Sequence, residues 1–202
     1  MRAAEQDRAD VAAARTAWQT DMAGVSPERL VFLDECGVLT GMARLYGRSP
    51  RGQRAPGTVP CGRWTRRSVL GALGQEGMVA TMSVAAAMDG AVFHAYLEQV
   101  LLPALRQRKP DAVLVMDNLG AHKTPAVRAL LDRAGFAYHY LPSYSPDLNP
   151  IEPAWAKLKA ELRRVGAPTA AELHQALGPA LGRITTENAT GYFRHAGYHR
   201  LN

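Results

Sequence analysis

Tyr144-Ser145-Pro146-Asp147-Leu148-Asn149-Pro150-Ile151-Glu152 is the stretch of this sequence that decides its fold. Turn-forming residues and an Asn-Pro helix-start signal stand directly before Glu152. A helix should begin there, because Trp155, Leu158 and Leu162 follow at helical spacing. The prolines restrict the backbone around the turn, so the sequence predicts a carboxylate held in one place at the start of a helix.

Two more acidic residues each end a short apolar run. Leu30–Leu33 leads into Asp34, and Ala112–Met116 leads into Asp117. Short uninterrupted apolar runs are typical of strands buried on both faces of a sheet that helices cover. Strands early in the chain and helix–strand alternation later predict a three-layer α/β domain.

The rest of the chain is expected to fill the layers of that domain. Its clearest helix covers residues 89–109, and residues 41–67, rich in Gly, Pro and Arg, predict an irregular hairpin or loop. The other expected elements are a lead-in helix over about 3–20, two strands within 68–87, a helix over 123–134, a strand over 136–141, a helix from 152 to about 164, and one or two small helices after 169.

Length and composition favour one globular domain. The 202 residues are 47% hydrophobic and 21% charged, which argues against disorder. Cys36 and Cys61 are too few for a disulfide framework and share no metal-site spacing, so a reducing cytoplasm fits. No apolar run approaches the roughly 18 residues that span a membrane. We therefore expect a cytoplasmic protein without a membrane partner.

The positive charge is concentrated in one interval. Between Glu35 and Glu76 there is no acid, and seven arginines give a charge of +7 against +6 for the whole chain, so the remainder carries −1. Such a segment suits a DNA phosphate backbone, although a solvated loop explains it too. Lys157 and Lys159 form part of a second basic set, which a solvated helix face explains equally. The arginines are Arg44, Arg48, Arg51, Arg54, Arg63, Arg66 and Arg67.

Three positioned acids suggest magnesium-dependent phosphodiester chemistry. Two metal ions about 3.5–4 Å apart activate the attacking oxygen and stabilise the leaving one, and magnesium accepts a few carboxylates while keeping waters. Each acid has an alternative role. Asp34 or Asp117 could simply begin a turn. Glu152 could complete a capping box, with Asn149 as N-cap and Pro150 at the first helical position.

Two neighbouring residues leave further alternatives open. Glu35 should face the opposite side of the strand from Asp34 and is the second choice for the acid there. His122, five residues after Asp117, could contact a scissile phosphate or a metal-bound water, but a lone histidine is more often structural.

Three blocks in the same order carry a family resemblance. They are Leu33-Asp34-Glu35, then Val115-Met116-Asp117-Asn118-Leu119-Gly120-Ala121-His122, and then Leu141-Pro142-Ser143-Tyr144 continuing to Glu152. Together they resemble the DDE domain of a mariner-related bacterial insertion-sequence transposase of the IS-six-thirty group. The resemblance covers nearly the whole chain, and its last block is the most specific. One departure is Ser143, where the family usually has a second proline.

The resemblance implies an RNase H-like fold, a mixed five-stranded sheet with helices on both faces. Asp34 would lie on the first strand, Asp117 on the neighbouring fourth and Glu152 on the following helix, holding two Mg²⁺ or Mn²⁺ ions. The implied reaction is cleavage of transposon-end DNA, then attack of the freed 3′-hydroxyl on target DNA. The domains would be a lead-in helix and linker (1–28), the catalytic domain (29–166) and its helical extension (167–202).

Further roles and partners follow from the same resemblance. His122, Asn118 and Asn149 would support the acids. The active form would be a homodimer on DNA in the nucleoid, and the helix-turn-helix segment that reads transposon ends would be separately encoded or missing here. An RNase H-like nuclease without strand transfer, or an inactive or domesticated DNA-binding remnant, stays open as an alternative.

Overall fold

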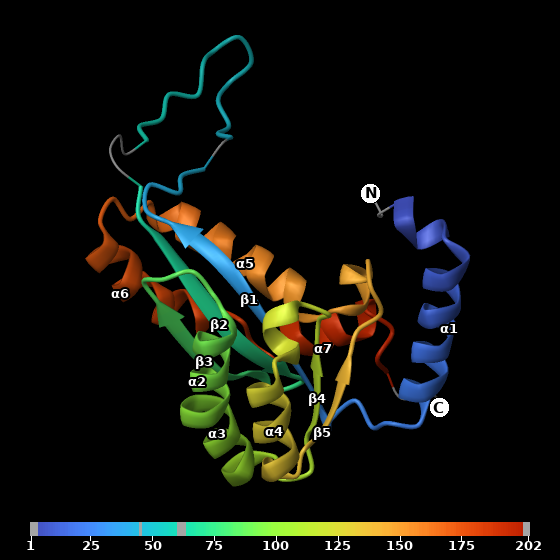
Figure 1. Ribbon diagram of the computed structural model, residues 1–202. Helices are drawn as coiled ribbons and strands as arrows, with labels where there is room; N and C mark the ends of the chain where they lie inside the picture. The colour runs from blue at the N-terminus through green and yellow to red at the C-terminus, as the bar shows by residue number, and fades with distance from the viewer. Residues whose placement is uncertain (1–3, 45, 60–63, 200–202) are drawn as a thin grey trace.

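A mixed five-stranded sheet forms the middle layer of the computed structural model, which describes residues 4–44, 46–59 and 64–199 (Figure 1). Its strands are β1 (Leu30–Leu39), β2 (Arg66–Gly74), β3 (Gly77–Val84), β4 (Val113–Met116) and β5 (Ala137–Tyr140). The strand order is β3-β2-β1-β4-β5. β1 is antiparallel to β2 and parallel to β4, so it joins an antiparallel half of the sheet to a parallel half.

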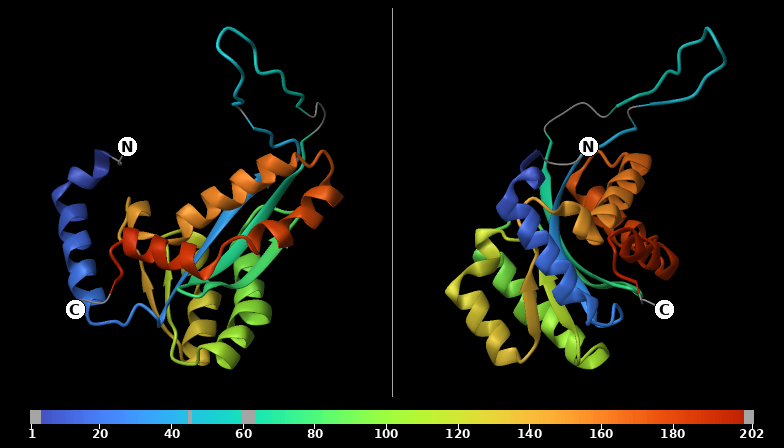
Figure 2. Two further views of the ribbon diagram at one scale, coloured as in Figure 1. Left: turned by 180° about the vertical axis from the view of Figure 1, so that it is seen from behind. Right: turned by 90° about the vertical axis from the view of Figure 1, so that its right-hand side faces the viewer.

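Helices cover both faces of the sheet, as predicted. The right-hand view of Figure 2 shows α5, α6 and α7 on one side and α2, α3 and α4 on the other. The helical elements are η1 (Ala4–Asp7), α1 (Ala9–Ala23), α2 (Gly90–Tyr96), η2 (Leu97–Leu101), α3 (Leu102–Arg108), η3 (Gly120–Lys123), α4 (Pro125–Ala134), η4 (Pro146–Leu148), α5 (Ile151–Val165), α6 (Ala170–Leu181) and α7 (Thr186–His195).

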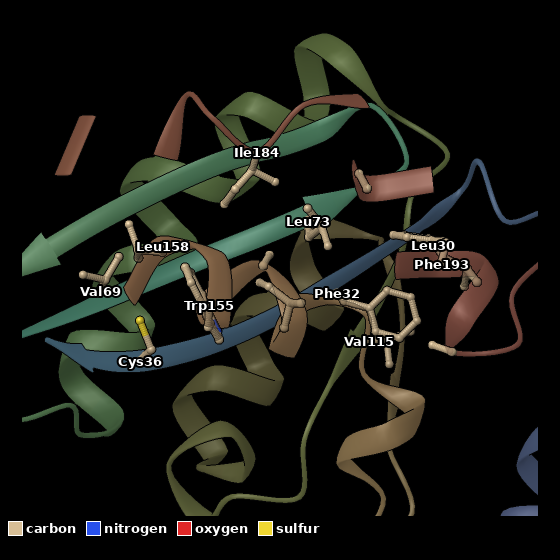
Figure 3. Packing of buried hydrophobic residues seen from close by; sticks show 14 of the residues in the cluster. Leu30, Phe32, Cys36, Val69, Leu73, Val115, Trp155, Leu158, Ile184 and Phe193 are labelled. Carbon is tan, nitrogen blue, oxygen red and sulfur yellow. The ribbon is translucent and has the colours of Figure 1, made fainter. Parts of the chain in front are cut away.

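β1 is buried on both faces because alternate side chains enter two different cores. Leu30 and Phe32 pack in the core that includes Trp155 of α5, whereas Val31 and Leu33 pack beneath the opposite helices. Figure 3 shows the first of these cores, with side chains of β1, β2 and β4 directed toward Trp155, Leu158 and Phe193. The apolar run before Asp34 therefore has the role that the sequence predicts.

The end of β1 was placed wrongly in the sequence interpretation. The strand continues past Asp34 to Leu39, because β2 pairs with it throughout, from Phe32 opposite Leu73 to Leu39 opposite Arg66. Asp34 thus lies in the middle of a strand, and the alternative that it begins a turn is wrong. Asp117 does follow the last residue of β4.

The helix predicted over 89–109 forms with one irregularity. Asp89 caps it by accepting a hydrogen bond from Val92 N–H at 2.8 Å. Between α2 and α3, η2 is a π-helical turn that ends two residues before Pro103. Proline has no N–H and crowds the carbonyl four residues earlier, which explains the wider turn.

The Gly-, Pro- and Arg-rich interval is irregular in its described parts up to Thr65, as predicted, and its last two residues already belong to β2. Residues 46–59 form no helix or strand, and Figure 1 shows them extending away from the layered body beside one end of α5. None of the described helices is both long and apolar enough to pass through a lipid bilayer.

Residues near both ends of the chain hold the turn that precedes α5. Tyr198 donates its hydroxyl hydrogen to Leu148 C=O at 2.8 Å and accepts a hydrogen bond from Trp18 Nε1 at 2.9 Å. Arg15 forms a two-point ion pair with Asp147, with its shorter contact at 2.6 Å. The turn is therefore attached to α1 as well as to the core.

Candidate active site

Asp34, Asp117 and Glu152 line one cavity of about 390 Å³. β1 and β4 are adjacent and parallel, so Asp34 and Asp117 lie toward the same edge of the sheet. Glu152 is the second residue of α5, and the segment from 141 to 146 completes the wall. The fold thus brings together acids that are separated by 83 and 35 positions in the sequence.

Asp34 is the most buried of the three acids, with 9% of its surface exposed. Its Oδ2 accepts a hydrogen bond from Trp155 Nε1 at 3.2 Å, and its Oδ1 accepts one from Glu35 N–H at 2.8 Å. Burial, followed by the negative charge of Glu152, raises the pKa of Asp34 to about 8. Without a cation, this carboxyl is mainly protonated at neutral pH.

The position opposite Asp34 on β2 is Gly71. A Cβ there would lie 2.5 Å from Cη2 of Trp155 and 2.6 Å from Cε of Met78. Both distances are far below normal contact, so the missing side chain makes room for the indole ring. The hydrogen bond from Trp155 to Asp34 therefore depends on a glycine in the neighbouring strand.

Asp117 lies against a buried histidine. Its Oδ1 is 2.7 Å from Nδ1 of His122, and Nε2 of the same ring is 3.3 Å from Oε2 of Glu35. Neither contact has the alignment of a good hydrogen bond, so we describe both as ion pairs. His122 is fully buried and does not line the cavity; its ring lies 4.1 Å from that of Phe93, centroid to centroid.

The two neighbouring carboxylates determine the direction in which the pKa of His122 is shifted. Burial by itself lowers the pKa of His122, but contact with Asp117 and Glu35 outweighs it and raises the pKa to about 9. Burial by itself raises the pKa of Asp117, but His122 and the N–H of Leu119 outweigh it and lower the pKa. Asp117 is therefore ionised where Asp34 is not.

Glu152 is exposed at the mouth of the cavity. Partial desolvation raises its pKa, Lys159 acts in the opposite direction, and the charges of Asp117 and Glu35 raise it further. The acids therefore repel one another across the cavity, and a cation among them would relieve that repulsion.

The predicted capping box at Glu152 does not form. α5 begins at Ile151 after Pro150, and no side chain caps it. Glu152 N–H instead bonds the main-chain oxygen of Asn149 at 3.2 Å, because Asn149 follows a 3₁₀ turn that directs its side chain inward. Asn149 is 4% exposed, and its Oδ1 has no hydrogen-bond partner among the described residues. The structural alternative for Glu152 is therefore wrong.

Asn118 and Tyr144 shape the rim of the cavity. Asn118 Nδ2 donates to Leu141 C=O at 2.9 Å, which ties the residue after Asp117 to the opposite wall. Tyr144 has a φ of +56°, an uncommon conformation for a residue with a side chain, and Gln6 Nε2 donates to its carbonyl at 2.7 Å.

The donor set fits a hard divalent cation in its chemistry. Carboxylate oxygens and one amide oxygen face or border a single cavity, and magnesium binds such ligands while keeping several waters. Among the residues that the structure describes, no three His, Cys, Asp or Glu side chains already converge closely enough to hold an ion.

The structure separates the predicted DNA-binding residues into groups. Arg44, Arg48, Arg51, Arg54 and Arg66 are exposed, and Arg63 lies outside the described residues.

The remaining basic residues are less exposed to solvent. Arg67 is half-buried, with Nη2 3.5 Å from Ser83 Oγ. Lys157 donates to Asn188, and Lys159 is half-buried near Glu152.

Sequence reasoning missed two contributors to the site. Trp155 was identified only as an apolar helix residue, although it stands three positions after Glu152 and hence on the same side of α5. Glu35 was predicted to face the opposite side of β1 from Asp34, and the structure agrees, but its pairing with His122 was not predicted. No signal in the sequence reveals that pairing, since the two residues are 87 positions apart.

Comparisons with known proteins agree with this geometry. Residues 29–174 match the family described as DDE superfamily endonuclease. No curated protein sequence matches the chain. Among solved structures, the Mos1 transposase paired-end complex with left transposon end is 19% identical, with a TM-score of 0.71, and the match covers 91% of this chain and 57% of that one.

Two further structures are similar. The Mos1 mariner paired-end complex with Mn is 18% identical (TM-score 0.72; 93% of this chain, 59% of that one). The Mos1 transposase catalytic domain with Raltegravir and Mg is 15% identical (TM-score 0.71; 96% and 91%). The chain thus spans less than two thirds of the two paired-end relatives and nearly all of the catalytic domain. These likenesses confirm the predicted RNase H-like fold.

Proposed function

Because this chain belongs to the DDE superfamily of endonucleases, we propose that it is the metal-dependent catalytic domain of a DNA transposase. The reaction is cleavage of transposon-end DNA, followed by attack of the freed 3′-hydroxyl on target DNA. We assign the chain to the mariner-related bacterial insertion sequences of the IS-six-thirty group, on the three sequence blocks that contain Asp34, Asp117 and Glu152. The observation that carries the proposal is the single cavity that these acids share.

The three acids act as ligands for divalent cations, two Mg²⁺ or Mn²⁺ ions in our proposal. When bound, these ions activate the attacking oxygen and stabilise the leaving one. Asp117 is already ionised, Glu152 approaches from the helix, and Asp34 must lose its proton for the site to fill. The solved Mos1 structures that contain Mn and Mg support this choice of ion.

Asn118, His122 and Asn149 support the acids in different ways. Asn118 ties the Asp117 turn to the opposite wall, and His122 holds Asp117 from behind. Asn149 brings to the same cavity a buried amide oxygen that has no hydrogen-bond partner in the described part of the chain, where a ligand could satisfy it.

DNA is the partner that the basic residues favour. We propose that the exposed arginines of the 41–66 interval, together with Arg63, Arg67, Lys157 and Lys159, contact the phosphate backbone, which gives salt-sensitive affinity without sequence preference. Recognition of transposon ends belongs to a helix-turn-helix segment outside these residues, and the active form is a homodimer. The protein would then work in the cytoplasm, on nucleoid DNA.

A nicking assay tests the function directly. A labelled duplex that carries the element's own ends is incubated with Mg²⁺ or Mn²⁺ and with the chain or its Glu152→Gln variant. We expect 3′-hydroxyl products at the ends with the wild-type chain and none with the variant. If neither this chain nor a fusion to the upstream helix-turn-helix segment cleaves, the protein is the inactive DNA-binding remnant instead. Cleavage without joining to target DNA would identify a nuclease.

A further inference from the structure

β1 presents two consecutive acids to opposite faces of the sheet. Asp34 points toward α5, where Trp155 contacts it, and Glu35 points toward the other helical layer, where it meets His122. Glu35 does not line the cavity that the three acids share, although His122 connects it to one of them. The fold thus contains a fourth carboxylate behind the site.

The histidine between Glu35 and Asp117 is held firmly in place. The ring of His122 is fully buried against Phe93. Its main-chain N–H donates to Leu119 C=O at 3.0 Å, and Tyr140 donates its hydroxyl hydrogen to the main-chain carbonyl of His122 at 3.1 Å. A ring with both nitrogens facing carboxylate oxygens can interact favourably with both only when each nitrogen carries a hydrogen. The ring thereby bridges the two carboxylates.

Among the residues that the structure describes, the polar contacts to Asp117 fall on one of its oxygens. Oδ1 lies 2.7 Å from Nδ1 of His122 and accepts a hydrogen bond from Leu119 N–H at 3.0 Å. This leaves Oδ2 as the oxygen that can serve a ligand in the cavity. The side chain of Asp117 is 43% exposed and follows the end of a short strand, so its orientation depends on these two contacts.

We propose that Glu35 is a positioning residue that acts through His122 to orient Asp117 for metal binding. The inference rests on the proposed function of the site. Glu35 contacts the Nε2 edge of the His122 ring, and Asp117 contacts the Nδ1 edge of the same ring. Without the carboxylate of Glu35, the ring would lose its partner on one edge, and Oδ1 of Asp117 would be held less firmly.

Binding of Mn²⁺ to the DNA-free chain, measured by calorimetry, tests this role apart from catalysis. Glu35→Gln removes the charge but keeps the size of the side chain, and we expect it to weaken Mn²⁺ binding by roughly 10–100-fold, the usual effect of losing an outer partner of a metal ligand. Glu35→Asp keeps the charge but has a shorter side chain, so its Mn²⁺ affinity should lie between those of the wild type and Glu35→Gln. Glu98→Gln is the matched control, because Glu98 also faces a histidine, His94 at 3.8 Å, but lies away from the cavity.

A second readout separates positioning from a merely structural role. In the nicking assay, the Mn²⁺ concentration for half-maximal rate should rise in Glu35→Gln by the same factor, while metal-free DNA binding does not weaken. Equal Mn²⁺ affinity in Glu35→Gln and wild type would overturn the proposal and leave the proposed function intact. If Glu35→Gln does not fold, Glu35→Asp decides by the same measure. Failure of the wild-type chain to bind Mn²⁺ would instead refute the metal site, and this inference with it.

Discussion

Two acids of the same site, Asp34 and Asp117, have their pKa values shifted in opposite directions by their surroundings. Asp34 is enclosed and faces other negative charges, which raises its pKa to about 8, whereas His122 helps to lower the pKa of Asp117. One carboxylate is therefore ready for a cation at neutral pH, and the other must release a proton as the cation arrives. Metal binding should be coupled to pH through Asp34.

The first prediction concerns the stability of the metal-free protein. The pKa of Asp34 is about 8 when folded and 3.8 in its ordinary state, so folded protein keeps a proton that unfolded protein releases. This contribution to stability is fully present below pH 3.8 and is lost as the pH rises toward 8. Asp34→Asn lacks it. As the pH rises from 3.8 toward 8, the wild type should therefore lose stability relative to the variant, by up to ~1.4 kcal/mol of unfolding free energy per pH unit.

Urea unfolding in EDTA at pH 5, 6, 7 and 8 measures this difference. Titrating groups that do not interact with Asp34 affect both proteins alike and cancel in the comparison, whereas Glu152, Glu35 and Asp117 are coupled to Asp34 and contribute to the measured difference. Parallel pH profiles for Asp34→Asn and wild type would show that Asp34 is ionised in the folded protein.

At this scale, the sequence located the acids but not their environment. The apolar runs before Asp34 and Asp117 place both in one sheet, because such runs form buried strands. The ion pairs of His122 depend on how α2 and η3 pack against β1, and no local pattern encodes that packing. The unpaired side-chain oxygen of Asn149 was not predicted either. The local sequence rule makes Asn149 a helix cap, whereas the chain forms a 3₁₀ turn that directs this side chain inward.

Among the elements, β2 has an unexpected influence on the site. Gly71 lies opposite Asp34, and its lack of a side chain admits the Trp155 ring. The sequence predicted two strands within 68–87 but offered no reason for a glycine at this position. That reason exists only once α5 lies across the sheet.

Gly71→Ala should therefore destabilise the protein. The new methyl group would meet Trp155 and Met78 at distances that force movement, which costs about 1–3 kcal/mol in a packed core. Urea unfolding followed by tryptophan fluorescence measures both the loss of stability and the shift of the ring. Gly178→Ala is the control, because a Cβ at that position of α6 meets nothing within 4 Å and should not destabilise the helix. Equal stability of Gly71→Ala and wild type would contradict the steric argument.

The third prediction concerns the beginning of β2. The Arg66 guanidinium lies over Gly37 of β1, where a Cβ would come within 2.9 Å of Nη2, and both residues border a groove beside Glu35. Because Arg66 is exposed and borders the same groove as Glu35, Arg66→Ala should weaken DNA binding and reduce the salt slope by about 1. Filter binding at several salt concentrations measures this, with Arg133→Ala on α4 as a charge-matched control. Identical slopes for the two variants would mean that Arg66 contacts no phosphate.

Residues near both ends of the chain meet at the turn before α5. Trp18 of α1, Tyr198 near the C-terminus and Leu148 of the turn share one chain of hydrogen bonds. The family match begins at residue 29, but α1 contributes Trp18 and Met22 to the same core as α5. The sequence predicted α1 only as a lead-in, because its contacts connect residues up to 180 positions apart.

Tyr198→Phe should show what this connection contributes. The variant loses the donor to Leu148 and the acceptor for Trp18, both buried, at a cost of about 1–3 kcal/mol. Nicking should also slow at temperatures where the variant is fully folded, because the turn forms part of the cavity wall. Thermal unfolding and the nicking rate measure the two effects. Tyr138→Phe, which removes only an exposed hydroxyl contact with Asp132, should change neither.

The fit between Gly71 and Trp155 also has a consequence for inheritance. A glycine that exists to admit one indole ring cannot mutate alone, and the tryptophan cannot shrink without leaving a void beside Asp34. The two positions should therefore change together among descendants of this chain. A lineage with smaller residues at both 155 and 78 would be the one in which position 71 is free to carry a side chain.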